Sequence, residues 1–341
     1  MESVVGGLAS ALARRGHDVE VITLQRAITD GGVLPEGTWG GVQYRRLRRL
    51  GPRRYPMGCG LFGAVRGADL VHVHGLDGLA DQLVRSGHIV GISTHGGFFH
   101  TSHTPFKKLW LRLVTRRTLR RANAVWFTSA ADRDLLYRCC RIEGSVVANG
   151  VDVDFYSAVA RRPQAGRWLV PGRIDAHKGI EDLILVLAKL KRPDVHVHLV
   201  GPDRVPHLRD KLMKLAHRLG VVGQITIRGP VQDLRSEFAR CELALFPSRY
   251  EGFGVCVVEA MAARVPCVVS SIQAFDALVT DGVDAIQVDF RDVECAAARL
   301  AQPMNLEQLV RGGQRTSARY SWSKVVLEWE RQYTRLVGST P

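Results

Sequence analysis

Segments with the pattern of β-strands alternate with segments with the pattern of helices along most of this chain. Short apolar runs bounded by turn residues are followed by stretches in which apolar residues recur at helical spacing. This alternation is typical of a parallel sheet covered by helices on both faces. In the second half, the expected strands are 167–171, 195–200, 224–228, 243–247, 267–270 and 285–288. The expected helices there are 180–190, 206–219, 232–239, 255–264, 292–301 and 305–319.

The first half shows the same alternation in a weaker form. A helix is expected over 3–15, because its apolar residues have helical spacing and Gly16 ends the run. A basic helix is expected over 107–121. The expected strands are Val19–Leu24, Val42–Arg46, Asp69–His74, Ile89–Thr94, Ala124–Ser129 and Ser145–Ala148.

The length of 341 residues indicates two domains, because a single core rarely grows past about 250–300 residues. Residues 149–152 form a turn motif, and residues 157–166 have the composition of a linker. We therefore expect an α/β fold with two doubly wound, Rossmann-like domains, over 1–158 and 159–320. A helix at about 321–337 is expected to pack back on the first. The two domains are expected to face across a cleft, and such folds bind nucleotides at the carboxyl ends of their strands.

The net charge of +14, with a pI of about 9.9, favours anionic partners. That charge is compatible with nucleic acid, phosphorylated ligands or an anionic membrane surface. We find no recognition-helix pattern and no array of stacking aromatic residues, so nucleic acid is not expected. The seven cysteines include no C-x-x-C pair, which indicates a reduced, cytoplasmic chain. No signal-peptide pattern and no apolar run of about 18 residues is evident.

The most informative run covers residues 246–259 and reads Phe-Pro-Ser-Arg-Tyr-Glu-Gly-Phe-Gly-Val-Cys-Val-Val-Glu. A strand ends, a glycine-bearing loop follows, and a helix begins near Val255. Gly252 and Gly254 allow the backbone to approach a ligand closely. The free amides at a helix start, together with its dipole, are suited to a diphosphate.

Two acidic residues lie in the same run, Glu251 in the loop and Glu259 in the helix. A carboxylate beside phosphates would be repelled, so we expect Glu251 to bind the donor sugar and Glu259 the ribose. The alternative is an ordinary connection with two solvated glutamates. Cys256 also lies near the helix start, but no base pattern marks it as a nucleophile.

A second run, Gly-Arg-Ile-Asp-Ala-His-Lys-Gly, covers residues 172–179 and follows the first strand of the second half. Arg173 offers a fork of donors and Lys178 a mobile charge, which together suit a departing diphosphate. The alternative is two solvated cations beside a helix start.

Histidines mark the expected strand ends of the first half. His95 stands where a strand gives way to a glycine turn, in the run Ser-Thr-His-Gly-Gly-Phe-Phe-His over 93–100. It is a candidate contact for the donor sugar or the acceptor, and a packed histidine is the alternative. His72 and His74 share one strand face at a spacing that fits a metal. No third ligand is evident, so we expect structural histidines and no metal cofactor.

These residues together resemble glycosyltransferase family 4, a family of GT-B fold, over nearly the whole chain. The matching positions are Asn149-Gly150-Val151-Asp152, Arg173, Lys178 and Glu251-Gly252-Phe253-Gly254 followed by Glu259. The resemblance implies a retaining, metal-independent hexosyltransferase. It implies that Arg173 and Lys178, next to Gly172, hold the diphosphate, and that Gly254 and Val255 bind phosphates through their amides. It also implies that Glu251 contacts the hexose, Glu259 the ribose, and that His95 lines the reaction site.

A narrower resemblance concerns the branch that moves mannose from GDP-mannose to a polyprenol-diphosphate-linked oligosaccharide in exopolysaccharide assembly. The matching pieces are Arg54-Tyr55-Pro56, residues 68–77, 93–101 and Tyr320-Ser321-Trp322-Ser323. The resemblance implies peripheral association with the cytoplasmic face of the inner membrane, for which the basic helix over 107–121 is the candidate. A UDP-sugar donor, or a sugar-nucleotide epimerase on the same fold, remains an alternative.

Members of this family open with a strand and a Gly-Gly loop before their first helix. Here the residues that follow Met1 already match that helix, and Gly6-Gly7 lie inside it. The absent strand would be central in a doubly wound sheet. We therefore expect the natural start to lie upstream of Met1.

Overall fold

The computed structural model describes residues 2–25, 35–52, 55–96, 110–203, 205 and 207–338. The chain divides into two compact units: unit 1 holds residues 1–150 and 322–341, and unit 2 holds 151–321. The division lies before the expected boundary at residue 158. The reason is that α7 (Val153–Ser157) packs against α11 (Val255–Ala262) of unit 2.

The sheet of unit 2 is parallel throughout and has the order β12-β11-β10-β13-β14-β15. This is the doubly wound order, in which the strand sequence reverses direction between β10 and β13. Its strands are β10 (Arg167–Pro171), β11 (His196–Val200), β12 (Ile225–Arg228), β13 (Leu243–Phe246), β14 (Cys267–Ser270) and β15 (Ile286–Val288). All six expected strands of this half are confirmed.

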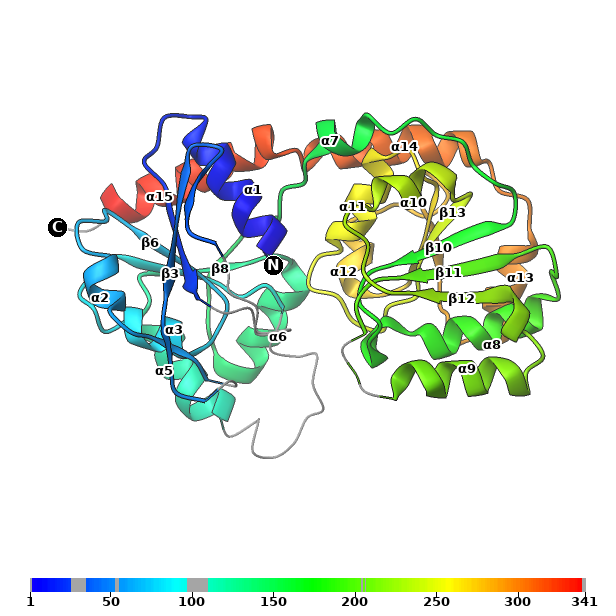
Figure 1. The fold of residues 1–341 in the computed structure, drawn as a ribbon, viewed down its shortest axis with the longest axis horizontal. Coiled ribbons are helices and arrows are strands. Elements are labelled where there is room, and N and C mark those ends of the chain that lie inside the picture. The colour runs from blue at the N-terminus through cyan, green and yellow to red at the C-terminus, as the bar shows by residue number, and fades with distance from the viewer. Residues whose placement is uncertain are drawn as a thin grey trace. The chain divides into compact units, whose positions relative to one another are not determined.

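Helices cover both faces of this sheet (Figure 1). One layer holds α8 (Ile180–Leu190), α9 (Leu208–Arg218) and α13 (Val293–Ala301), and α8 packs on both of the others. The other holds α7, α10 (Arg235–Arg240), α11 and α14 (Leu306–Arg319), and the short α12 (Gln273–Asp276) follows β14. The core between sheet and helices includes Trp168, Leu187 and Phe290.

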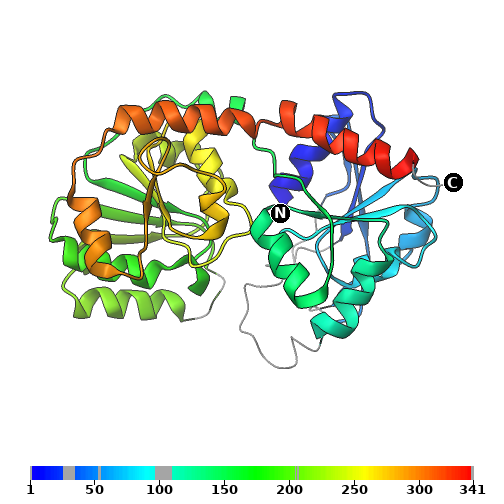
Figure 2. The ribbon, with the colours of Figure 1, turned by 180° about the vertical axis from the view of Figure 1, so that it is seen from behind.

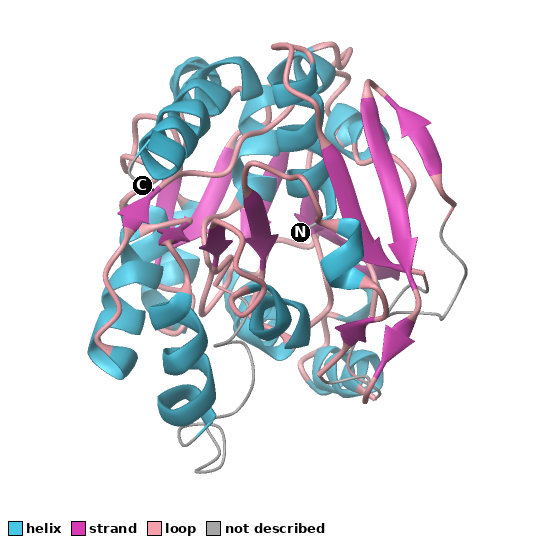
Figure 3. Cartoon of the chain, turned by 90° about the vertical axis from the view of Figure 1, so that its left-hand side faces the viewer, coloured by secondary structure: helices cyan, strands magenta, loops and turns pink. Residues whose placement is uncertain are grey.

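The described strands of unit 1 form separate sheets rather than one doubly wound sheet. In this part of the chain, no strand pairs with both β1 and β6, so the sheet is not continuous. Figure 3 shows the strands of unit 1 among their helices. One sheet is β1-β3-β2, with β1 (Glu20–Leu24), β3 (Val42–Leu47) and β2 (Gly37–Trp39). A parallel sheet holds β6 (Val71–His74), β7 (Val90–Ser93), β8 (Ala124–Phe127) and β9 (Ser145–Val146), and a small one pairs β4 (Arg49–Leu50) with β5 (Met57–Gly58).

Two helices of unit 1 that the sequence patterns do not single out begin with side-chain caps. Asp77 accepts hydrogen bonds from the amides of Leu79 and Ala80, and Ser129 accepts one from the amide of Asp132. The helices of unit 1 are α1 (Glu2–Ala13), α2 (Leu61–Ala64), α3 (Gly78–Leu83), α5 (Arg116–Arg121), α6 (Ala130–Cys140) and α15 (Trp322–Gly338). A π-helical segment, Leu111–Thr115, leads into α5.

Helix α15 returns to unit 1 and packs on α1, as the view from behind shows (Figure 2). Its Glu330 pairs with Arg15 at 2.6 Å and with His17 at 3.0 Å. The indole of Trp322 lies against two glycines, since a Cβ at Gly7 or Gly150 would come within 2.3 Å of it. These contacts explain why the C-terminal helix belongs to unit 1.

The basic helix is described from Trp110, and residues 107–109 lie outside the described part. Leu111 and Leu119 are buried in the core of unit 1, whereas Leu113 is 61% exposed. Arg117, Arg120 and Arg121 are exposed as well. Among the described helices, none has the length and apolar content needed to span a bilayer.

Candidate active site

The two sequence runs that predict the donor site form the loops after β10 and β13, the neighbouring strands at which the strand order of the unit 2 sheet reverses. Residues 172–179 follow β10, and residues 247–254 follow β13, the strand that pairs with β10. Parallel strands end at the same edge of a sheet, so the two loops emerge side by side. In open α/β sheets this crevice is where ligands bind.

The two loops are locked together by backbone packing. Gly179 has a φ of +63°, and a Cβ there would lie 1.9 Å from the carbonyl oxygen of Pro247, so only glycine fits. The amide of Arg249 donates to the carbonyl oxygen of His177 at 2.8 Å. The guanidinium of Arg249 also holds both oxygens of Asp182 at 2.7 Å. The positions of the side chains that the loops carry are therefore set by a rigid frame.

Lys178 and Glu251 meet across these loops. The Lys178 ammonium lies 2.5 Å from Glu251 Oε1, which also accepts a hydrogen bond from Ser248 at 2.9 Å. The two charged side chains are only 17% and 15% exposed. Burial raises the pKa of Glu251, but the charge and hydrogen bond of Lys178 and the bond from Ser248 hold it below its usual value. Glu251 is therefore ionised at neutral pH.

Arg173 is partly buried in the same loop as Lys178. Among the described residues, its guanidinium has no hydrogen-bond or ion-pair partner. The preceding residue, Gly172, has a φ of +119°, and a Cβ there would lie 3.9 Å from the Lys178 nitrogen. A partly buried guanidinium without a partner favours an anion at this edge.

Helix α11 begins at the same edge of the sheet. Gly254 caps it with a φ of +100°, and a Cβ there would lie 2.7 Å from the ring of Phe275. The carbonyl oxygen of Gly254 accepts hydrogen bonds from the amides of Val257 at 2.9 Å and Val258 at 3.3 Å, so the amides of Val255 and Cys256 precede the first of these bonds. These two amides are the candidate phosphate donors of the helix start.

The ring of Phe253 does not lie open for a ligand. It is 8% exposed and packs edge-on against Tyr320 with ring centroids 5.2 Å apart. Gly252 precedes it in the loop. At these two positions, a contact with a donor would fall to the backbone.

Glu259 lies one turn into α11 and is buried. Burial raises the pKa of its carboxyl, against hydrogen bonds from Cys256 and Tyr156 that lower it. Burial, and then the charge of Glu259, raises the pKa of the Cys256 thiol well above its usual value. The charge of Lys178 lowers this pKa, and that of Glu251 raises it further. Cys256 therefore lies among the charged residues of the site but is not a thiolate nucleophile.

The structure joins Lys178 to Glu251 at 2.5 Å, and it joins Glu259 to Cys256 and Tyr156 by side-chain hydrogen bonds. The sequence patterns do not identify Ser248 and Tyr156, which hold the two glutamates. The signal for Ser248 is its spacing of three residues before Glu251 in a tight loop. Tyr156 belongs to α7, the first helix of unit 2, and no local sequence pattern predicts its contact with Glu259.

His95 lies in unit 1, directly after β7. Its backbone is left-handed, with a φ of +50°, which is uncommon for a residue other than glycine. Its Nε2 lies 2.8 Å from Nδ1 of His74, at the end of β6. Burial lowers the pKa of His95 to about 4, so the ring is neutral at neutral pH. Residues 97–100 of the same run lie outside the described residues, as does Arg54.

The histidines of β6 make hydrogen bonds to protein side chains. His72 makes hydrogen bonds of 2.7 Å to Tyr333 through Nδ1 and to Ser93 through Nε2. Both ring nitrogens are therefore engaged, as expected for a structural histidine. Among the described residues, no group of three potential ligands is placed to hold a metal.

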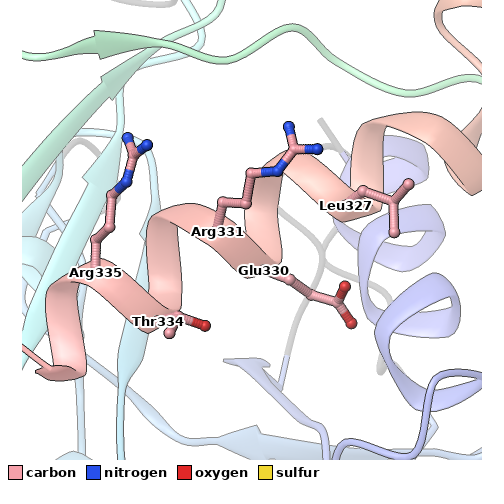
Figure 4. Close-up of a pocket in the computed structure, with 5 residues that line it drawn as sticks. All are labelled: Leu327, Glu330, Arg331, Thr334 and Arg335. Carbon is pink, nitrogen blue, oxygen red and sulfur yellow. The ribbon is translucent and has the colours of Figure 1, made fainter.

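Unit 1 also has a hollow of about 450 Å³ on the surface of α15. Its lining, drawn in Figure 4, is Leu327, Glu330, Arg331, Thr334 and Arg335. None of these residues belongs to the predicted site.

Comparison with known families matches both units. The family described as Glycosyltransferase Family 4 matches residues 1–155, and the family described as Glycosyl transferases group 1 matches residues 160–317. The chain is 32% identical to the GDP-mannose:cellobiosyl-diphosphopolyprenol alpha-mannosyltransferase of Xanthomonas oryzae pv. oryzae, over 99% of this chain and 93% of that protein. The phosphatidyl-myo-inositol mannosyltransferase of Mycobacterium tuberculosis is 34% identical over 57% of this chain and 54% of its own length.

Solved structures show the same fold. The sucrose-phosphate synthase of Thermosynechococcus elongatus superposes with a TM-score of 0.79 at 21% identity, over 98% of this chain and 93% of that one. HepE of Anabaena, solved with UDP and glucose, gives a TM-score of 0.71 at 18% identity, over 93% and 100% of the two chains. The expected GT-B fold, with its two Rossmann-like units, is thereby confirmed. The chain is a glycosyltransferase, and it belongs to glycosyltransferase family 4.

Proposed function

We propose that this chain transfers a mannosyl residue from GDP-mannose to an oligosaccharide carried on polyprenol diphosphate, as a step in exopolysaccharide assembly. The Xanthomonas relative, which matches this chain over nearly its whole length, is named for that donor and for such an acceptor. A second relative of the same name comes from Komagataeibacter xylinus.

The observation that carries the proposal is the arrangement of cations at the switch point of unit 2. Arg173 has no partner among the described residues, and Lys178 lies in the same loop, paired with Glu251. The free amides of Val255 and Cys256 lie at the start of α11, at the same edge. Two cations and a helix start are the groups that bind a diphosphate.

The proposed reaction keeps the anomeric configuration of the donor and uses no metal ion. Arg173, Lys178 and the α11 amides stabilise the negative charge that grows on the diphosphate as the sugar–oxygen bond breaks. The acceptor hydroxyl attacks from the face that the diphosphate leaves, and an oxygen of the leaving phosphate takes its proton. Glu251 binds hydroxyls of the hexose and Glu259 those of the ribose. From unit 1, His95 contributes to positioning the sugar.

The test is incubation of the full chain with GDP-mannose, other nucleotide sugars and a cellobiosyl lipid-diphosphate acceptor, with and without EDTA. We expect transfer of mannose, release of GDP, and an α-linked product by NMR, with equal rates in EDTA. Transfer from a UDP-sugar alone would replace the proposed donor. Isomerisation of a donor without an acceptor would indicate an epimerase.

We also propose that α5 and the segment before it bring the chain to an anionic membrane surface, where a lipid-linked acceptor resides. The apolar face of this helix is buried, so the contact would use Leu113, which is exposed, and the outward arginines. Basic side chains near an anionic leaflet each contribute about 1 kcal/mol.

Co-sedimentation with vesicles that contain anionic lipid tests this contact. We expect the chain to bind such vesicles and not neutral ones. A variant with Arg117, Arg120 and Arg121 changed to serine should lose most of the binding. Equal binding by this variant and the unchanged chain would reject the membrane role of the helix.

A further inference from the structure

Aspartate 132 fixes the backbone on both sides of His95. Asp132 is fully buried in the first turn of α6, and its Oδ2 accepts hydrogen bonds from the Thr94 hydroxyl and, at 3.3 Å, from the amide of Gly96. The amide of Thr94 also bonds the carbonyl oxygen of Trp126 at 3.1 Å. These bonds brace the left-handed turn, so the freedom that remains to His95 is rotation of its side chain.

The side chain of His95 has one described hydrogen-bond partner, which is His74. The two rings lie with their centroids 5.1 Å apart and an interplanar angle of 26°. Nε2 of His95 and Nδ1 of His74 are 2.8 Å apart, so one nitrogen donates a proton and the other accepts it. The tautomer of either ring therefore determines the tautomer of the other.

His74 is itself held in place from behind. Its ring lies against the ring of His72, with centroids 3.9 Å apart. His72 is tethered at both nitrogens, by Ser93 and by Tyr333 of α15, and its ring also packs on Trp126 and Trp329. Contacts therefore run from Tyr333 of α15 through His72 to His74, and they hold the ring of His74 in the orientation that reaches His95.

We propose that His74 is a positioning residue for His95: through their shared hydrogen bond it fixes both the rotamer of the His95 ring and the nitrogen that carries its proton. This inference rests on the proposed role of His95 in the transfer reaction. The neutral state of the pair agrees with it, because burial, and then the charges of His72 and His95, lower the pKa of His74 well below its usual value.

The chemical consequence concerns the ring nitrogen that faces away from His74. With the proton of the shared bond assigned to one side, Nδ1 of His95 is either a fixed donor or a fixed acceptor toward a sugar hydroxyl. Without His74, both tautomers and several rotamers are populated, and the productive one is a fraction of the total. The expected effect is therefore on turnover more than on donor affinity, since the residues proposed to bind the diphosphate and ribose of the donor lie in unit 2.

The test compares His74→Leu, which removes the shared bond, with His74→Asn, whose amide places a polar atom near the position of Nδ1. In the mannosyl transfer assay, His74→Leu should lower kcat about tenfold with little change in KM for GDP-mannose. His74→Asn should restore most of the loss. In a His95→Ala background, His74→Leu should cost less than about twofold, because the two residues act as a unit.

His88→Leu is the matched control, because His88 lies in the same unit just before β7 and, among the described residues, its hydrogen bonds go to Ser86. It should leave kcat unchanged. Equal losses from His74→Leu in both backgrounds would overturn the inference and leave His74 a purely structural role. So would equal losses from His74→Leu and His74→Asn.

Side-chain nitrogen NMR on histidine-labelled chain gives a readout that does not depend on activity. His95 should show one neutral tautomer in the unchanged chain and a mixture, or a different tautomer, in His74→Leu. Identical His95 signals in the two chains would overturn the inference. If the unchanged chain transfers no mannose, the proposed function fails, and this spectrum still decides whether His74 positions His95.

Discussion

Removal of the Lys178 charge should damage stability and turnover by separable amounts. The Lys178 and Glu251 side chains are mostly buried, at 17% and 15% exposure, and lie 2.5 Å apart. Breaking a buried pair from one side leaves an uncompensated charge, which costs about 3 kcal/mol. We therefore expect Lys178→Met to lower the stability of unit 2 by about that much. Glu251→Gln should cost less, about 1–2 kcal/mol, because an amide oxygen still accepts from the ammonium.

The double variant Lys178→Met/Glu251→Gln removes both charges, so it should lie within about 1 kcal/mol of the unchanged chain. Its turnover should nevertheless remain lower by roughly 100-fold or more, because nothing replaces the cation at the leaving diphosphate. Recovered stability, with turnover still well below that of Glu251→Gln alone, is the signature of a catalytic charge that is also a structural one.

Hydrogen exchange suits this measurement, because the chain has two units and its global unfolding need not be two-state. Protection of peptides from β10 and β13 reports the stability of unit 2 in each variant. Lys189→Met is the matched control, since Lys189 pairs with Glu294 at 3.1 Å with side chains 52% and 73% exposed. It should change stability by less than about 0.5 kcal/mol. Additive stability losses in the double variant, or unchanged turnover of a folded Lys178→Met chain, would refute the reasoning.

Two further results are expected from the packing and protonation of unit 1. Gly150→Ala should destabilise the unit by about 1–3 kcal/mol in thermal or urea unfolding, because its Cβ would lie 2.3 Å from the indole of Trp322. Gly63→Ala meets nothing within 4 Å and should be neutral or slightly stabilising. The pKa of His95 is lowered from 6.5 to about 4, so between these values the unfolded chain binds a proton that the folded chain does not. The urea midpoint of unit 1 should therefore fall as pH drops from 6.5 towards 4, and a midpoint that rises over this range would contradict the buried, neutral ring.

The sequence predicts unit 2 more completely than unit 1. Its strands are short apolar runs with clear turn signals, and a parallel sheet covered on both faces requires that pattern. The N-cap signals Asp77 and Ser129 were present in the sequence of unit 1, but the helices after them have few apolar residues at regular spacing. The division of its strands into separate sheets depends on which strands pair, and hydropathy does not encode pairing.

The sequence predicted which residues lie at the candidate site, but it did not predict which of their side chains contact one another. Strand ends and glycine turns place Arg173, Lys178, Glu251 and Glu259 on one edge. The contact between Lys178 and Glu251 joins residues far apart in the chain, and it became visible only in the structure. His74 is a similar case, because its partner follows from the register of β6 and β7, in which His74 lies opposite Ser93.

In both units a residue of positive φ turns the chain soon after a parallel strand that leads to candidate site residues. Gly172 does this after β10 in unit 2 and His95 does it after β7 in unit 1, whereas Gly254 has a positive φ at the start of α11. The ladder fixes where the strand ends, and the left-handed residue fixes the direction of the next few, so the backbone sets the geometry of the site. Exposed side chains on such a frame can change at little cost to the fold, whereas one member of a buried pair such as Lys178 and Glu251 cannot. The turn glycines cannot be replaced in this way. At Gly254, another residue would have to adopt a φ of +100°, and its Cβ would lie 2.7 Å from the ring of Phe275. We therefore expect specificity to vary through the exposed side chains of these loops, while the turn glycines preserve the backbone at the proposed diphosphate site.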